Sequence, residues 1–263
     1  MDFFFVACVY TRSWMMAGHD TTFAVVLRGI IRGRAQCGRK KQHRVDATSV
    51  VLGNFMDRVV APLLESGPDV RVQVCICTYA FPGLMELERD LRMRCAYARG
   101  RIDVLPVHVY DRPIETGTQL YAMRAAMHHV LRTLALEDVS CVFVCRPDTL
   151  WKCSICDVLG RSIRVSSVTY LFNERATLLR KNCSDLISDV FFAVPTPKLV
   201  HEFMAALEHH DCHTDLHGLY RSAKAAAANM NLTPKIAWAR CHEDRFDSNT
   251  DNRTNPFYTI QRS

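Results

Sequence analysis

The sequence predicts a single α/β domain with a mostly parallel central sheet flanked by helices. Short apolar runs of strand length alternate with longer stretches of helical spacing, in the order strand, helix, strand, helix, strand, helix, strand. Parallel strands need crossover connections, and right-handed helical crossovers satisfy that need. Hydrophobic residues make up 49% of the 263 residues and charged residues 23%, a balance that favours an ordinary globular core.

The first 150 residues contain the clearest alternation. Apolar residues at helical spacing predict a helix over 48–64, and Glu65-Ser-Gly-Pro ends it. The polar, basic stretch 34–46 predicts a loop. Strands are predicted at 23–31, 70–79, 102–109 and 141–145, and further helices at 84–97 and 118–134.

The pattern is looser in the second half of the chain. Strands are predicted at 163–172 and 186–194, and helices at 198–209 and 222–230. The tail from Arg240 is polar and predicts no regular structure.

The stretch Cys141-Val-Phe-Val-Cys-Arg-Pro-Asp148 indicates a functional site. Its apolar run predicts a strand buried on both faces, and Pro147 ends the strand because proline cannot donate to a central ladder. Arg146 and Asp148 therefore fall at the carboxyl end of a central strand, the edge at which open α/β sheets bind ligands. Arg146 suits a phosphate oxygen, and Asp148 suits a divalent cation. The alternative is a salt bridge and turn at the end of the strand.

Three further charged residues stand in or beside apolar strands. Arg28 interrupts the strand at 23–31, and Arg32 stands at its predicted end; either suits a nucleotide phosphate. Asp189 is isolated between apolar neighbours, and a buried carboxylate needs a reason. The alternatives are pairing with structural carboxylates for the arginines and a capping or turn role for Asp189.

Other polar groups are weaker candidates. The basic run from Arg32 to Arg44 contains no aromatic residue for stacking on bases, which favours a solvated loop over nucleic-acid binding. Cys153-Ser-Ile-Cys156 lacks the second ligand pair of a structural zinc site. His242, in Cys241-His-Glu-Asp, is a candidate metal ligand. The cluster of His209, His210, His213 and His217 is interpreted as a polar surface.

The net charge, the cysteines and the absence of several motifs limit the functional classes and the cellular location that we expect for the protein. The formal net charge of +6 favours anionic ligands without implying nucleic acid. No segment approaches the roughly 20 apolar residues that span a bilayer, and Asp2 replaces the basic start of a signal peptide. Several of the 12 cysteines lie in apolar runs and resemble buried hydrophobes, so a cytoplasmic location is expected. The absence of G-x-G-x-x-G, P-loop and G-x-S-x-G motifs counts against dinucleotide oxidoreductases, P-loop NTPases and serine hydrolases.

Several stretches together resemble the nucleotide-sugar transferases of the GT-A fold. The likeness runs over most of residues 23–195 and depends on order and spacing. Its parts are Phe-Ala-Val-Val-Leu-Arg-Gly-Ile-Ile-Arg (23–32), Asp-Arg-Val-Val-Ala-Pro-Leu-Leu (57–64), Val-Gln-Val-Cys-Ile-Cys-Thr-Tyr (72–79), Gln119, Val-Phe-Val-Cys-Arg-Pro-Asp (142–148), Ile-Ser-Asp-Val-Phe-Phe-Ala (187–193) and Asn-Pro-Phe-Tyr (255–258).

This resemblance implies a single GT-A-like domain and a glycosyltransferase that moves sugar from a nucleotide-diphosphate donor to a hydroxyl of a carbohydrate or glycoprotein. Such proteins occur in large DNA viruses, algae and bacteria, so a viral example would work in the host cytoplasm. The family usually takes Mn²⁺ or Mg²⁺ at an Asp-x-Asp, which here reads Arg-Pro-Asp. Residues 1–22 would be an N-terminal extension or first strand, 23–150 the nucleotide-sugar-binding half, and 151–263 the acceptor-side half with the tail.

The resemblance also suggests roles for individual residues. Asp148 would hold the metal, with His242 as a second metal candidate, and Asp189 would act on the acceptor side as the catalytic base. The donor contacts would come from Arg28, Arg32, Gln119, Arg124 and Arg146. Two alternatives remain: an inactive binding module with the same fold, and a basic nucleic-acid-binding protein that uses the 34–44 run.

Overall fold

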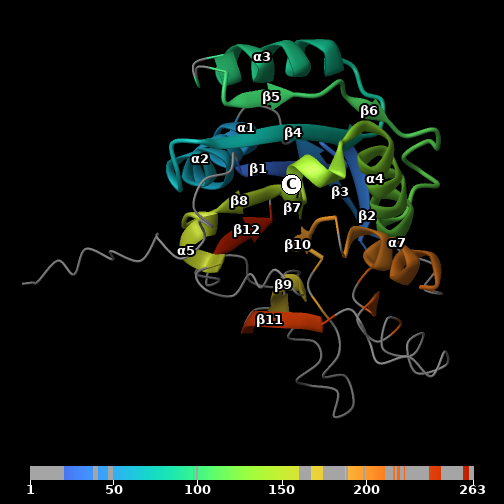
Figure 1. Cartoon of the computed structure of the whole chain (residues 1–263). Helices are drawn as coiled ribbons and strands as arrows, with labels where there is room; N and C mark the ends of the chain where they lie inside the picture. Colours follow the sequence, from blue (N-terminus) through green and yellow to red (C-terminus); the bar gives the residue numbers. More distant parts are fainter. Residues whose placement is uncertain are drawn as a thin grey trace, which may run out of the picture.

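A mixed, mostly parallel β-sheet forms the centre of the molecule (Figure 1). The computed structural model describes residues 21–37, 41–46, 50–96, 98, 100–159, 167–173, 187, 189–197, 199–210, 216, 218–219, 222, 237–243 and 257–260. The strands run in the order β11-β9-β10-β7-β1-β4-β5, with β6 also paired to β4. Their bounds are β1 Thr21–Gly29, β4 Val70–Thr78, β5 Ile102–Val104, β6 His108–Val109, β7 Val139–Cys145, β9 Ser167–Asn173, β10 Phe191–Pro195 and β11 Ala237–Glu243.

One strand of this sheet is reversed. β10 is antiparallel to both of its neighbours, β7 and β9, whereas the other pairings in the sheet are parallel. The amino end of β10 therefore meets the carboxyl ends of β1 and β7 at one edge of the sheet. This α/β architecture agrees with the predicted fold class.

Helices cover both faces of the sheet. Figure 1 shows α4 and α7 on one side and α1, α2 and α5 on the other, and α3 packs into the same apolar cluster as α1 and α2. The helical segments are α1 Val50–Phe55, the π-helical turn η2 Met56–Val60, α2 Ala61–Glu65, α3 Leu84–Ala96, α4 Gln119–Thr133, the 3₁₀ turn η3 Leu136–Asp138, α5 Ile155–Leu159 and α7 Val200–Glu208.

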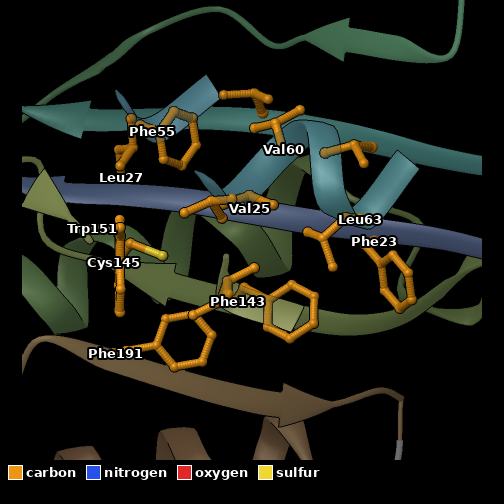
Figure 2. Packing of buried hydrophobic residues seen from close by; sticks show 14 of the residues in the cluster. Phe23, Val25, Leu27, Phe55, Val60, Leu63, Phe143, Cys145, Trp151 and Phe191 are labelled. Atoms are coloured by element: carbon orange, nitrogen blue, oxygen red, sulfur yellow. The ribbon is translucent and has the colours of Figure 1, made fainter. Parts of the chain in front are cut away.

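Alternation along β1 divides the core into two layers. Phe23, Val25 and Leu27 face the α1–α2 side, and Figure 2 shows Phe55, Val60 and Leu63 packed against them. Ala24 and Val26 face α4 and α7 instead. Because side chains alternate across a strand, the next even-numbered residue, Arg28, points to the α4 side at the carboxyl end of β1.

The predicted helix at 48–64 contains a change of helical register. α1 and α2 are separated by the π-helical turn η2, while the backbone stays helical throughout. Pro62 gives a physical reason, because proline has no N–H and its ring clashes with the carbonyl four residues earlier. A wider turn before Pro62 relieves that clash.

Pro106 divides the predicted strand at 102–109. β5 ends at Val104, and β6 resumes at His108, with both segments paired in parallel to β4. Proline cannot donate a ladder hydrogen bond, so the pairing breaks around it.

Two predictions of irregular structure are wrong. The basic stretch 34–46 forms most of a hairpin, β2 Arg32–Cys37 with β3 Lys41–Asp46, rather than a loop. The tail contains β11, which extends the main sheet, and β12 Tyr258–Ile260, which pairs antiparallel with β8 Thr149–Trp151. Backbone pairing needs no continuous apolar run, and in β12 the side chains of Tyr258 and Ile260 are also buried in the core.

Several predictions lie outside the described residues. They are the N-terminal stretch up to residue 20, the helix at 222–230 beyond Ser222, and the positions of His213 and His217.

Candidate functional site

The candidate site lies where the chain changes direction across the sheet. From β1 the chain builds β4 and then β5 on one side, and it later returns to place β7 on the other side of β1. The point between β1 and β7 is therefore a topological switch point, and open α/β sheets bind ligands outside the carboxyl ends of the strands there. Arg28 is the next-to-last residue of β1 and Arg146 follows β7, so both residues lie at this point.

Arg146 links two carboxylates at the end of β7. Its Nε and Nη2 donate to Oδ1 and Oδ2 of Asp148 at 2.9 and 2.7 Å. Its Nη1 donates to both carboxylate oxygens of Asp189 at 3.0 Å. Both carboxylates are buried, with 5% of Asp148 and 3% of Asp189 exposed. A paired fork of this kind is among the stronger charge-assisted hydrogen bonds in proteins.

Arg28 approaches the same group from β1. Its Nη2 donates to the backbone oxygen of Asp189 at 2.8 Å and lies 3.7 Å from the carboxylate oxygen Oδ2. Only 2% of Arg28 is exposed, and its Nε has no hydrogen-bond partner among the residues that the structure describes. Arg28, Arg146, Asp148 and Asp189, called the charge cluster below, come from the ends of three neighbouring strands.

Backbone features at the strand ends hold the charge cluster in place. Gly29 ends β1 with φ +121°, a conformation that L side chains rarely adopt, and a Cβ built there would lie 3.7 Å from Cδ of Pro147. The backbone N–H of Arg146 donates to the carbonyl of Val190, which extends the β7–β10 pairing towards Asp189. The strand predicted at 186–194 begins later than expected, at Phe191, so Asp189 lies in the turn before β10 and not within the strand.

Burial and pairing set the protonation of the two arginines. Burial lowers the pKa of Arg146, but Asp148 and Asp189 more than offset this and hold it well above its ordinary value. Burial also lowers the pKa of Arg28, Asp189 raises it and Arg146 lowers it, and the net direction is downward. The two guanidiniums can lie close together because the carboxylate of Asp189 neighbours both of them.

Of the other predicted donor contacts, Gln119 lies at the same edge of the sheet as the charge cluster, whereas Arg124 does not join the cluster. Gln119 begins α4 at the carboxyl edge of the sheet, and its buried Oε1 has no hydrogen-bond partner in the described ranges. Arg32 is exposed at the start of β2. Arg124 does not join the charge cluster, because its guanidinium donates to the carbonyls of Leu207, Glu208 and His210 at the end of α7.

His242 lies far from Asp148 across the sheet. Its backbone belongs to β11, three strands from β7, which corresponds to about 14 Å at the usual strand spacing. The predicted pairing of His242 and Asp148 in one metal site therefore finds no support from the sheet order.

Three buried hydroxyls at the same edge escaped the sequence prediction. Thr78, Tyr79 and Tyr110 end or follow β4 and β6, and the rings of Tyr79 and Tyr110 meet edge to face at 4.8 Å. Among the residues that the structure describes, the buried hydroxyl of Thr78 has no hydrogen-bond partner. The pKa of Tyr110 is raised well above its ordinary value, chiefly by burial. The signal was available, since Thr78-Tyr79 directly follows an apolar strand.

The charge cluster does not fit a divalent cation as it stands. Each of the four carboxylate oxygens of Asp148 and Asp189 accepts a hydrogen bond from Arg146. A cation on these carboxylates would have to replace that guanidinium or lie against its positive charge. Across the part of the chain that the structure describes, no group of three or more histidine, cysteine or acidic side chains is arranged to hold a metal.

Comparisons with known proteins give no family for the chain. The sequence matches no protein-family model and no curated protein. Within the described residues, none of the helices combines the length and apolar character needed to cross a membrane.

Proposed function

We propose that this protein binds a nucleotide diphosphate sugar at the carboxyl edge between β1 and β7 and transfers the sugar to a hydroxyl acceptor. The observation that carries this proposal is the convergence of Arg28, Arg146, Asp148 and Asp189 at the switch point of a mostly parallel sheet. The sequence resemblance to GT-A-like nucleotide-sugar transferases supports the same assignment, with a carbohydrate or glycoprotein as acceptor.

The arginines of the charge cluster suit a reaction that breaks the bond between a sugar and a nucleotide diphosphate. When the sugar leaves, negative charge develops on the nucleotide diphosphate, and fixed donors aimed at that charge lower the barrier. Arg28 is the residue best placed for this role, because its buried Nε has no hydrogen-bond partner within the described part of the chain. Gln119 and the hydroxyls of Thr78 and Tyr110 line the same edge as neutral hydrogen-bonding groups for the donor.

Asp189 is the proposed base that accepts the proton of the acceptor hydroxyl. Both of its carboxylate oxygens accept hydrogen bonds from Arg146. Proton transfer therefore requires that ligand binding draw Arg146 towards the diphosphate and free an oxygen of Asp189.

A binding module without transfer activity is the second candidate. The pairing of both carboxylates with Arg146 favours it, because a general base must be within hydrogen-bond reach of the acceptor proton. The two candidates share the nucleotide site and differ only in turnover.

Nucleotide binding is tested by calorimetric titration of the wild type with UDP, GDP and their sugar conjugates. Arg28→Met should weaken binding at least about tenfold, which corresponds to 1.4 kcal/mol. Arg124→Met is the matched control, because it removes a partly buried arginine that contacts only α7 carbonyls and Glu208 among the described contacts. Equal affinity of Arg28→Met and wild type for every nucleotide, with both folded, would contradict the proposal.

Transfer is tested separately by donor hydrolysis. Release of free sugar by the wild type, reduced in folded Asp189→Asn at saturating donor, supports the transferase. Tight binding without release of sugar supports the inactive module.

A reducing, cytoplasmic compartment is part of the proposal. The seven cysteines whose state the structure describes are free thiols, and five of them are buried. Buried free cysteines are typical of proteins that keep their thiols reduced.

A further inference from the structure

The two carboxylates of the charge cluster share one cationic partner. Asp148 and Asp189 lie 41 positions apart in sequence, yet the same guanidinium binds both in two-point contacts of 2.7 to 3.0 Å. Paired carboxylates at a sheet edge are the usual ligands of Mg²⁺ or Mn²⁺. Here a side chain of the protein lies between them.

The charges of the cluster match those of a metal site. Two carboxylates with one divalent cation sum to zero, and two carboxylates with Arg28 and Arg146 also sum to zero. The arginines are covalently held and buried, with 11% of the Arg146 side chain and 3% of the Arg28 side chain exposed. A buried charge is destabilising unless it has a partner of opposite charge. Here every carboxylate oxygen of Asp148 and Asp189 accepts a hydrogen bond from Arg146.

We propose that Arg146, assisted by Arg28, takes the place of the divalent cation, so that this site handles a nucleotide diphosphate without metal. The inference depends on the proposed nucleotide site for its ligand, but its statement about metal concerns the protein alone. Arginine suits this role because its planar fork binds carboxylate and phosphate oxygens with two donors each. A diphosphate would exchange with Asp148 or Asp189 for the donors of Arg146.

The inference predicts that removal of Arg146 creates a cation site. In Arg146→Ala the two carboxylates would lose their common partner while remaining at the same sheet edge, and a divalent cation would relieve their repulsion. The variant should therefore bind Mn²⁺, which the wild type should not. Asp148→Asn in the Arg146→Ala background is the matched control, since it removes one of the two ligands.

The experiment has two arms. Electron paramagnetic resonance measures Mn²⁺ binding to the wild type, Arg146→Ala, the double variant and the single variant Asp148→Asn. The expected result is binding by Arg146→Ala alone. Mn²⁺ binding by the wild type that Asp148→Asn abolishes would overturn the inference, and this wild-type measurement holds even if Arg146→Ala fails to fold.

The second arm titrates the wild type with UDP and GDP in EDTA and then in millimolar Mn²⁺. Equal affinity in both buffers supports metal-free binding, whereas about tenfold tighter binding in Mn²⁺ would overturn it. If neither nucleotide binds in either buffer, the proposed function fails, and the Mn²⁺ measurements on the protein alone still decide whether Arg146 stands in the place of the cation.

Discussion

Arg146 connects the stability of the charge cluster with the chemistry that we propose for it. Its guanidinium is almost fully removed from water and is stable there only because two carboxylates surround it. Ligand binding must therefore exchange one set of hydrogen bonds for another of similar strength. A diphosphate is one of the few ligands with enough charge and enough oxygens to make that exchange.

Neutralising either carboxylate should destabilise the fold. Asp148→Asn or Asp189→Asn leaves part of the charge of Arg146 buried and unpaired, and we expect a loss of about 3 kcal/mol in the free energy of unfolding. Urea denaturation measures this loss. Asp90→Asn, which breaks the exposed pair with Arg94, is the control and should cost about 0.5 kcal/mol or less. Losses of equal size in Asp148→Asn and the control would show that the buried pairing contributes little.

The thiols of Cys75 and Cys77 on β4 predict a pH dependence of stability. Their sulfurs lie 3.7 Å apart, and hydrogen bonding from Cys77, assisted by His129, lowers the pKa of Cys75 to about 6 against the effect of burial. Between pH 6 and pH 9 the unfolded chain therefore holds a proton that the folded protein has lost. Stability should rise with pH across this interval.

The same pair predicts a reversal at higher pH. The pKa of Cys77 is raised well above its ordinary value by its partner thiol and by burial, so alkali should weaken the fold again. Urea midpoints measured across the pH range for the wild type and Cys75→Ala test both slopes. Parallel profiles for the two proteins would rule out the depressed pKa of Cys75.

At the scale of elements, contacts between α4 and α7 explain a residue that sequence reasoning had placed in the site. Arg124 lies on α4, and its four hydrogen bonds of 2.7 to 3.2 Å satisfy carbonyls at the carboxyl end of α7. A cation at that end also interacts favourably with the helix dipole. The role is to join two helices that cover the same face of the sheet.

Arg124→Ala should therefore lower stability without affecting ligand binding. We expect a loss of about 2 kcal/mol in the free energy of unfolding, because hydrogen bonds to a charged group are lost and helix-end carbonyls are left with fewer partners. Urea denaturation gives the stability, and calorimetric titration with UDP gives the affinity. A folded variant with lost affinity would instead return Arg124 to the site.

The sequence predicted those helices and strands whose formation depends on local apolar patterns. It did not predict strands whose formation depends on backbone pairing with another segment. Apolar periodicity located β4, α3, α4 and β7 within a few residues. Pro62 and Pro106 are visible breakers, but whether a breaker ends an element, widens a turn or splits a strand depends on the packing around it. The β2–β3 hairpin carries no apolar alternation, so its backbone pairing left no signal.

The sequence indicated the individual residues of the candidate site, but it did not predict the hydrogen bonds between them. Arg28, Arg146, Asp148 and Asp189 were each found because a charge stands in or beside an apolar strand. Their mutual pairing arises from the neighbouring positions of β1, β7 and β10, and the order of strands along the chain does not determine that arrangement. The hydrogen bonds of Arg146 to both carboxylates, which bear directly on metal binding, could be found only in three dimensions.

At the scale of the whole molecule, the two candidate ligand surfaces are formed by different strands. The nucleotide site proposed above uses the ends of β1, β7 and β10, whereas a nucleic-acid-binding protein would use the basic residues of the β2–β3 hairpin. These two regions belong to different sheets. A measurement that reports on the backbone along the chain can therefore separate the two functions in one experiment.

Hydrogen exchange with and without UDP is that measurement. Binding at the charge cluster should slow exchange of backbone amides in 28–31, 146–149 and 189–191, because ligand contacts there oppose local opening. Exchange of the backbone amides in 32–46 should be unchanged by UDP. Uridine, which lacks phosphates, is the matched control and should protect none of these segments. Protection of the hairpin by a single-stranded oligonucleotide, lost steeply as salt is raised, with no effect of UDP at the sheet edge, would favour nucleic-acid binding over the proposed transferase.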